Sequence, residues 1–188
     1  MTEKTPPSNV SPTSSSHKGL IQVFTGEGKG KTSAALGSVI RALGNGLRVF
    51  IVAFMKAGHA SGEWEVLSGL PNLSVARFGA GPLVNPANIR PQDREEAMKA
   101  LAEARQAMLS GNYDLIVLDE VNVAVAWGLI KLDDVIRLIE DKPLELELIL
   151  TGRGADKEIV KIADLVTEML NIKHPYDEGI VARKGFDY

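Results

Sequence analysis

The sequence predicts a single α/β domain with a mostly parallel β-sheet flanked by helices. Short apolar segments rich in β-favouring residues alternate along the chain with segments of helical spacing. The run LRVFIVAFM at residues 47–55 is continuously apolar, which is typical of a strand buried on both faces of a parallel sheet. A glycine-rich turn joins the first apolar run to the first helical segment and gives the third indication.

The expected strands are short apolar runs bounded by turn residues. The first run, LIQVFT, is ended by glycines, the run at 113–120 ends in two acids, and the run at 144–153 alternates before it becomes apolar. In order, the expected strands cover residues 20–25, 47–55, 73–78, 113–120, 144–153 and 164–174.

The expected helices have apolar residues at helical spacing and recognisable ends. The segment at 91–111 has Pro and acids in its first turn and Gly at its end, and the segment at 132–142 stops before Pro143. In order, the expected helices cover residues 32–44, 91–111, 132–142 and 155–163.

The composition is that of one globular domain and excludes several functions. The 188 residues allow one substantial core, and we expect residues 1–18, rich in Ser, Thr and Pro, to be a disordered tail before a domain at 19–188. No cysteine is present, which excludes disulfides, thiolate metal sites and a cysteine nucleophile. A formal charge of −3, no membrane-length apolar run and no secretory signal predict a cytoplasmic protein that binds neither nucleic acid nor membrane.

The segment VFTGEGKGKTSAA at residues 23–35 looks like a phosphate-binding loop with one glycine displaced. The pattern G-x-x-x-x-G-K-[ST], aligned on Gly30-Lys31-Thr32, requires a glycine at Thr25, and the chain has Gly26 instead. Such glycines let the backbone approach an anion, and the N–H groups of the loop and of the following helix then bind phosphates. We expect Lys31 to bring a positive charge to the phosphates and Thr32 a hydroxyl to Mg²⁺.

Two acids at the end of the strand YDLIVLDE are the natural partners of this loop. Asp119 and Glu120 would lie at the carboxyl end of a buried strand, where an acid commonly holds Mg²⁺ beside a phosphate loop. Together the loop and the acids predict a P-loop NTPase-like domain, a RecA-like three-layer sandwich.

These residues alone leave the reaction class open. The Asn-Lys-x-Asp segment of a GTPase is missing, since NIKH at 171–174 does not match, and the protein-kinase motifs are missing as well. A helicase or recombination ATPase and a small-molecule kinase both remain compatible with the loop and the acids.

Five segments together resemble the P-loop corrinoid (cob(I)alamin) adenosyltransferase family. They are GEGKGKTSAALG (26–37), MKAGHASGEWEVL (55–67), YDLIVLDEVNVAV (113–125), LILTGRGA (148–155) and ADLVTEMLNIKHPYDEGIVARKGFDY (163–188). They occur in the family's order and extend from about residue 19 to the C-terminus.

The resemblance implies an enzyme that transfers the 5′-deoxyadenosyl group of ATP to the cobalt(I) of a reduced corrinoid and releases triphosphate, in adenosylcobalamin biosynthesis or salvage. It implies a homodimer, a reduced flavoprotein as electron donor, and ATP bound in the reverse sense to ordinary NTPases. The implied catalytic residues are Lys31, Glu120 and Arg153. The resemblance implies Thr32 and Glu120 as metal ligands, and the position of Asp119 at the strand end adds it to this set. The implied nucleotide contacts are Gly26, Glu27, Gly28, Lys29, Gly30, Lys31, Thr32, Ser33 and Asn122.

One stretch departs from the family pattern. Many members have Gly-Phe-Thr-Trp where this chain has GPLVNP at 81–86, so Pro82, Leu83 and Val84 replace a segment whose aromatics are thought to displace the lower ligand of the corrinoid. Leu83 and Val84 would form an apolar wall over the corrinoid, whereas the alternative is a loop that orders when ligand binds.

Two other functions remain as alternatives. One is phosphoryl transfer by an ATPase or small-molecule kinase, resting on the loop and the two acids alone. The other is a corrinoid- or nucleotide-binding module without catalysis, which the missing aromatics of the 81–86 segment keep open.

Overall fold

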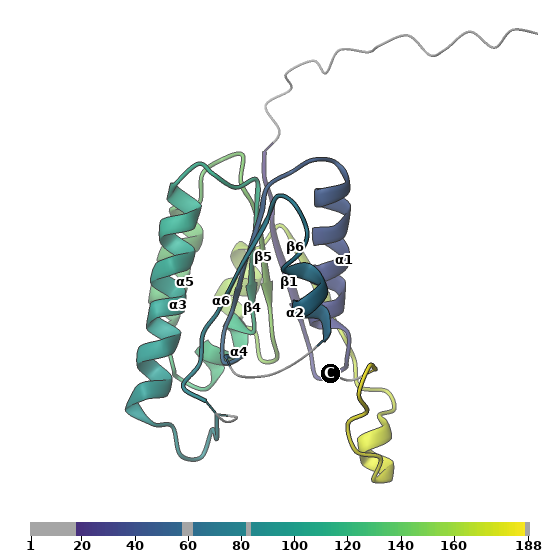
Figure 1. The fold of residues 1–188 in the computed structure, drawn as a ribbon. Coiled ribbons are helices and arrows are strands. Elements are labelled where there is room, and N and C mark those ends of the chain that lie inside the picture. The colour runs from purple at the N-terminus through teal and green to yellow at the C-terminus, as the bar shows by residue number, and fades with distance from the viewer. Residues whose placement is uncertain (1–17, 58–61, 82–83, 187–188) are drawn as a thin grey trace, which may run out of the picture.

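A computed structural model describes residues 18–57, 62–81 and 84–186, and these form one α/β domain around a six-stranded sheet (Figure 1). The strand order is β3-β2-β4-β5-β1-β6, and every neighbouring pair is parallel. The strands are β1 (Ile21–Thr25), β2 (Val49–Ala53), β3 (Leu73–Arg77), β4 (Leu115–Asp119), β5 (Glu147–Thr151) and β6 (Leu165–Glu168).

Helices cover both faces of the sheet and make a three-layer molecule. Helices α1 and α2 pack on one face, while α3, α4, α5 and α6 contribute side chains to the core on the other (Figure 1). The helices are α1 (Lys31–Gly44), α2 (Gly62–Leu67), α3 (Pro91–Leu109), α4 (Val121–Ala126), α5 (Leu132–Glu140), α6 (Lys157–Ile162) and the 3₁₀ turn η1 (Pro175–Glu178).

The central strands are apolar throughout because each of their faces meets a helix layer. In β2, Val49 and Ile51 belong to the core beneath α1, whereas Phe50 and Val52 belong to the core beneath α3. All five residues of β2 and of β4 are buried. This two-sided burial is the physical reason that the sequence shows continuous apolar runs here.

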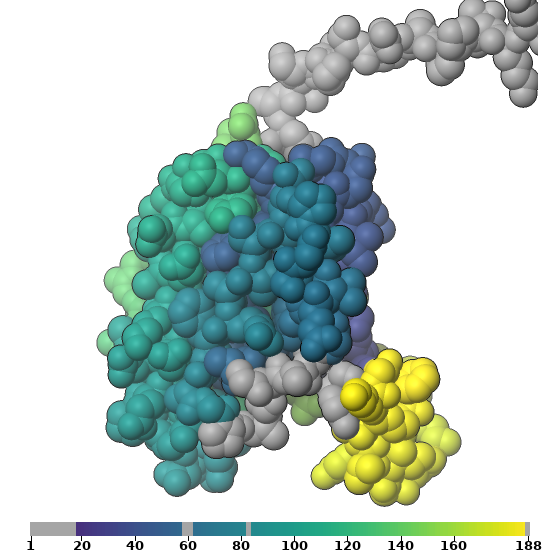
Figure 2. Space-filling view, viewed as in Figure 1, coloured from purple at the N-terminus to yellow at the C-terminus, as the bar shows by residue number. Residues whose placement is uncertain are grey.

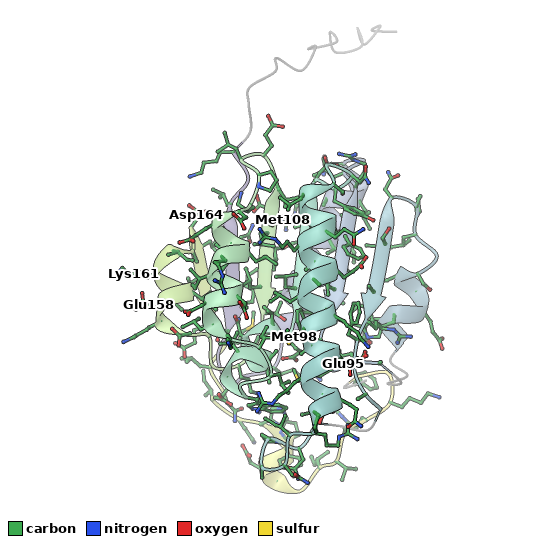
Figure 3. All side chains as sticks on the ribbon, turned by 90° about the vertical axis from the view of Figure 1, so that its left-hand side faces the viewer. Glu95, Met98, Met108, Glu158, Lys161 and Asp164 are labelled. Atoms are coloured by element: carbon green, nitrogen blue, oxygen red, sulfur yellow. The ribbon has the colours of Figure 1, made fainter. Side chains whose placement is uncertain are left out.

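Helix α3 packs against the sheet through a face rich in alanine (Figure 3). Ala97, Ala100, Ala104, Ala107 and Met108 are buried against the sheet, while Met98 is 61% exposed on the outer side. At its start the buried carboxylate of Asp93 accepts hydrogen bonds from the backbone N–H and the guanidinium of Arg90. The small alanines let a long helix lie close to the strands.

The structure confirms all the expected strands and helices and adds three short elements. Helices α2 and α4 and the turn η1 were not expected, and each has six residues or fewer, too few for a helical period to stand out. The expected strand at 164–174 ends at Glu168, and the following residues leave the sheet. The expected tail falls almost entirely on residues 1–17, which lie outside the described part of the chain.

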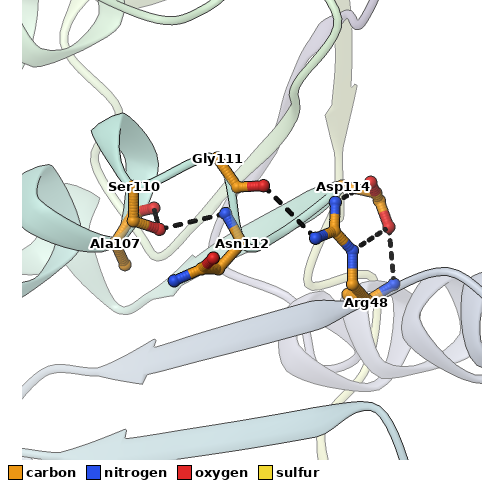
Figure 4. A network of polar contacts seen from close by, with 6 residues as sticks. All are labelled: Arg48, Ala107, Ser110, Gly111, Asn112 and Asp114. Atoms are coloured by element: carbon orange, nitrogen blue, oxygen red, sulfur yellow. Dashed lines mark hydrogen bonds and ion pairs between the residues drawn. The ribbon is translucent and has the colours of Figure 1, made fainter.

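A polar network lies at the amino ends of the strands, at the edge of the sheet opposite the glycine loop (Figure 4). The Arg48 guanidinium donates to both carboxylate oxygens of Asp114, at 3.1 and 2.7 Å, and to the carbonyl of Gly111 at 3.2 Å. Asp114 also accepts from the backbone N–H of Arg48. The network joins the start of β2 to the start of β4, two strands that are neighbours in the sheet.

Among the residues that the structure describes, no helix is long and apolar enough to cross a membrane.

We expect Asp114→Asn to lower stability in a pH-dependent way. The hydrogen bond from Arg48 lowers the pKa of the Asp114 carboxyl. A lowered carboxyl pKa stabilises the fold above the unfolded-state pKa of about 4, and this stabilisation is lost as pH falls toward the folded-state pKa. Thermal melts should therefore show a lower Tm for the variant at pH 7 and a difference that shrinks below about pH 4. The control Glu145→Gln changes an exposed turn carboxylate; a pH-independent deficit in Asp114→Asn would contradict this account.

Candidate nucleotide and metal site

The site lies at the carboxyl edge of the sheet, where the loops after β1, β2, β4 and β5 meet. The strand order places β2, β4, β5 and β1 side by side, and parallel strands bring their carboxyl ends to the same edge. The glycine loop at 26–30 follows β1, Lys56 follows β2, Asp119 and Glu120 close β4, and Arg153 follows β5. The predicted loop and the predicted acids are therefore brought together.

The glycine loop packs against the chain that leaves β6. Gly28 donates its N–H to the carbonyl of Met169 at 2.7 Å. A Cβ on Gly26 would lie 2.5 Å from the Met169 carbonyl oxygen, and one on Gly28 would lie 2.5 Å from that of Leu170. Gly26 also has φ +95°, a left-handed conformation that favours glycine. Close approach of another backbone thus explains why glycines occupy these two positions.

Lys31 and Gly30 form the start of α1. Gly30 precedes the helix with φ +118°, and Lys31 is 8% exposed with its Nζ donating to the carbonyl of Gly28 at 2.6 Å. Burial, together with the charge of Arg153, lowers the pKa of Lys31, while Glu120 and Glu27 act in the opposite direction. The lysine is held inside the curve of its own loop, where an ammonium can meet phosphate oxygens.

Asp119 is the most densely bonded group of the site. Its side chain is 1% exposed, and its Oδ1 accepts hydrogen bonds from the hydroxyls of Thr32, at 2.9 Å, and Thr151, at 2.7 Å. Its Oδ2 lies 2.7 Å from Nζ of Lys56. The loop threonine and the strand-end acid predicted to share a metal are in direct contact.

Glu120 is held beside Asp119 in a conformation unusual for its residue type. Its φ is +65°, and its N–H donates to the Thr151 hydroxyl at 2.9 Å. Burial, followed by the neighbouring charge of Asp119, raises the pKa of Glu120, while Lys56 and Lys31 oppose this. Left-handed backbone at a non-glycine residue costs energy and clusters at functional sites.

The other predicted contact residues surround this centre with differing exposure. Asn122 is fully buried in α4, and its Oδ1 has no hydrogen-bond partner among the described residues. Arg153 is 62% exposed, with its Nε 3.6 Å from Oε2 of Glu27. Lys29 donates to the carbonyl of Phe186 at 2.7 Å, and Ser33 is exposed in the first turn of α1.

Sequence reasoning missed two residues of the site, Lys56 and Thr151. Both lie in segments that carried the family resemblance, MKAGHASGEWEVL and LILTGRGA. Lys56 follows the expected strand at 47–55, and Thr151 lies inside the expected strand at 144–153 and is the last residue of β5. A basic or hydroxyl residue at the end of a central parallel strand is the signal that could have identified them.

The segment GPLVNP at 81–86, which departs from the family pattern, lies only partly within the residues that the structure describes. Pro82 and Leu83 lie outside the described residues. Val84 is partly buried and packs against the core beneath α3. Of the expected apolar wall, only Val84 lies within the described residues, and its contact is with the protein's own core.

The donor set fits a magnesium ion that is shared with a nucleotide. Thr32, Asp119 and Glu120 offer a hydroxyl and two carboxylates, the hard oxygen ligands that Mg²⁺ prefers. Within the described residues no three His, Cys, Asp or Glu side chains cluster as a metal site. Mg²⁺ usually binds one or two carboxylates together with substrate phosphates and water, which matches such an incomplete protein shell.

The fold and the site define an α/β domain of the P-loop-like class, with a glycine loop facing a buried acid. Within that class, the chain belongs to the family described as ATP:corrinoid adenosyltransferase BtuR/CobO/CobP, whose profile matches residues 17–188. It is similar to the corrinoid adenosyltransferase of Pseudomonas aeruginosa, with 37% identity over 91% of this chain and 84% of the relative. It is 33% identical to that of Escherichia coli K12 and 34% identical to the corrinoid adenosyltransferase CobA of Salmonella typhimurium, each over 91% of this chain and 86% of the relative.

The contact between the glycine loop and the chain after β6 predicts that an alanine in the loop lowers stability. An alanine at a helix glycine without such a contact should have the opposite effect. In Gly28→Ala the new Cβ would meet the Leu170 carbonyl at 2.5 Å, and we expect a loss of about 1–3 kcal/mol in unfolding free energy. The control Gly37→Ala lies in α1, where a Cβ meets no atom within 4 Å among the described residues, so stability should rise by up to about 1 kcal/mol. Urea unfolding measures both; equal stability of Gly28→Ala and wild type would refute the contact.

Proposed function

We propose that this chain transfers the 5′-deoxyadenosyl group of ATP to the cobalt(I) of a reduced corrinoid and releases triphosphate, as a step of cobalamin metabolism. The observation that carries the proposal is the contact between the glycine loop and the buried acid, Thr32 to Asp119, in a member of the ATP:corrinoid adenosyltransferase family. A threonine hydroxyl beside a buried carboxylate suits a site that binds phosphate and metal. The family description names a corrinoid as the group that receives the adenosyl unit.

In the proposed reaction the protein supplies no nucleophile of its own. The electron pair of cobalt(I) forms the bond to C5′, the C5′–O5′ bond breaks, and triphosphate leaves with that bond's electrons. The cobalt is formally oxidised to cobalt(III), so no further oxidant or reductant enters this step.

The residues of the site bind and orient the leaving group. Loop N–H groups and Lys31 would bind the triphosphate, because preorganised donors stabilise the charge that develops on it. Thr32, Asp119 and Glu120 would hold Mg²⁺, whose chemistry when bound is to neutralise phosphate charge. Arg153, beside Glu27 and largely exposed, would add a further cation at the rim of the loop.

We further propose that the functional form is a homodimer. Strand β6 is exposed along its whole length at the edge of the sheet, and the C-terminal segment stands out from the body of the domain (Figure 2). Large apolar side chains are exposed along both, at Leu165, Val166, Leu170, Ile172, Tyr176, Ile180, Val181 and Phe186. Apolar surface of this extent favours burial against another subunit. Sedimentation velocity should give twice the monomer mass, and a monomer at micromolar concentration would refute the dimer.

The proposed setting is the cytoplasm, with a reduced flavoprotein as electron donor. The reaction consumes cobalt(I), which a reductant must supply, and the family resemblance implies a reduced flavoprotein as that donor. A reduced flavodoxin-type protein should replace a chemical reductant in the assay. Failure of such donors, with activity retained under chemical reduction, would reject this partner.

The experiment that tests the function is product analysis. The protein is incubated with ATP, Mg²⁺ and chemically reduced cobalamin, and we expect the light-sensitive spectrum of the adenosylated product together with intact triphosphate. ADP and orthophosphate without an adenosylated product would indicate phosphoryl transfer instead. Tight binding of both ligands without turnover would indicate a binding module.

Two substitutions separate the phosphate-binding role from the metal-binding role. We expect Lys31→Ala to lower kcat/KM for ATP by about 10²–10³-fold, because a charge aimed at the leaving triphosphate is lost. Glu120→Gln should lower metal-dependent turnover by about 10–100-fold, with a raised Mg²⁺ requirement. Steady-state kinetics at varied ATP and Mg²⁺ measure both, with the exposed helix α6 variant Lys157→Ala as control. Near-normal kinetics in both variants would show that the site is elsewhere.

A further inference from the structure

Lys56 places its ammonium group against the carboxylates that the proposed metal would use. Its Nζ lies 2.7 Å from Oδ2 of Asp119 and 3.9 Å from Oε1 of Glu120. On another side it lies 5.9 Å from the centre of the Trp64 ring, within the range of a cation–π contact. Two carboxylates and one aromatic face thus surround this single side chain.

The backbone fixes Lys56 in this position. Met55 before it has φ +58°, a left-handed conformation that is uncommon outside glycine. The Lys56 N–H donates to the carbonyl of Phe78 at 2.8 Å, and Phe54 donates to the carbonyl of Asp119 at 2.9 Å. The turn after β2 is therefore anchored to both neighbouring strands, and Lys56 is aimed at the end of β4.

The ammonium and a divalent cation would compete for the same oxygen. Oδ1 of Asp119 already accepts from the hydroxyls of Thr32 and Thr151, which leaves Oδ2, the atom that Lys56 contacts. The Lys56 ammonium forms ion pairs with Asp119 at 2.7 Å and with Glu120 at 3.9 Å. A divalent cation approaching Oδ2 would therefore meet a like charge.

We propose that Lys56 is a positioning residue that serves as the resident counter-cation of the metal site. It holds Asp119 and Glu120 in place before the nucleotide arrives, and it weakens the binding of a free divalent cation. The negative charge of the triphosphate offsets that repulsion, so the metal binds together with ATP. Lys56 thereby couples metal binding to nucleotide binding. This inference rests on the proposed magnesium site.

The test measures Mn²⁺ affinity of the full chain without nucleotide, by the loss of the free-ion signal in electron paramagnetic resonance. Lys56→Met and Lys56→Gln should each bind Mn²⁺ at least about five-fold tighter than wild type, from the Coulomb energy of one charge at about 4 Å even with the screening of water. The Gln side chain keeps a hydrogen-bond donor for Asp119, so Lys56→Gln still provides the test if Lys56→Met fails to fold. Lys56→Arg keeps the charge and should bind as weakly as wild type.

A control variant and a second measurement distinguish the proposed role of Lys56 from a purely structural one. Lys161→Met removes an exposed lysine of α6 (Figure 3) and should leave Mn²⁺ affinity unchanged. Mg²⁺ added without ATP should raise the Tm of the two neutral Lys56 variants more than that of wild type, since tighter ligands stabilise more. A structural role alone would lower the Tm without changing metal affinity.

The outcomes separate this inference from the site on which it rests. If wild type binds ATP more tightly with Mn²⁺ than without, but Lys56→Met and Lys56→Gln bind free Mn²⁺ no better than wild type, the role of Lys56 is refuted and the metal site stands. If Mn²⁺ does not change the affinity of wild type for ATP, the metal site is refuted and the role of Lys56 with it.

Discussion

The site depends on one buried carboxylate, that of Asp119. Its side chain is 1% exposed and is bonded by Thr32 of α1, Thr151 of β5 and Lys56 after β2. A charge removed from water is tolerated only when partners compensate for it, and each hydrogen bond to a charged group contributes about 1.5–3 kcal/mol. The three partners come from parts of the chain far apart in sequence, so this carboxylate locks the carboxyl edge of the sheet into one arrangement.

The same edge explains the displaced glycine of the loop. Gly26 and Gly28 face the backbone of Met169 and Leu170, which arrives beside the loop because β6 pairs with β1. A side chain at either glycine would strike a carbonyl oxygen. The spacing of these glycines therefore follows from the chain after β6 as well as from the phosphates that the loop is proposed to bind.

The positive charges around the site suit the anionic leaving group of the proposed reaction. Lys31 is buried within the curve of the loop, Lys56 lies against the acids, and Arg153 stands at the rim. The backbone is left-handed at Glu120 itself and at Met55, the residue before Lys56. Preorganised charges of this kind suit a reaction in which the substrate is the nucleophile and the protein has only to position and stabilise.

The succession of strands and helices along the chain, the glycine loop and the two acids that end YDLIVLDE could all be predicted from the sequence. These follow from local periodicity and from motifs that lie within a few residues. The contacts of Lys56 and Thr151 with Asp119, and the contact of the loop with the chain after β6, became visible only in the folded structure. Asp119 is 63 residues from Lys56 and 32 from Thr151. Such contacts depend on which strands become neighbours, and strand order is set by packing of the whole sheet.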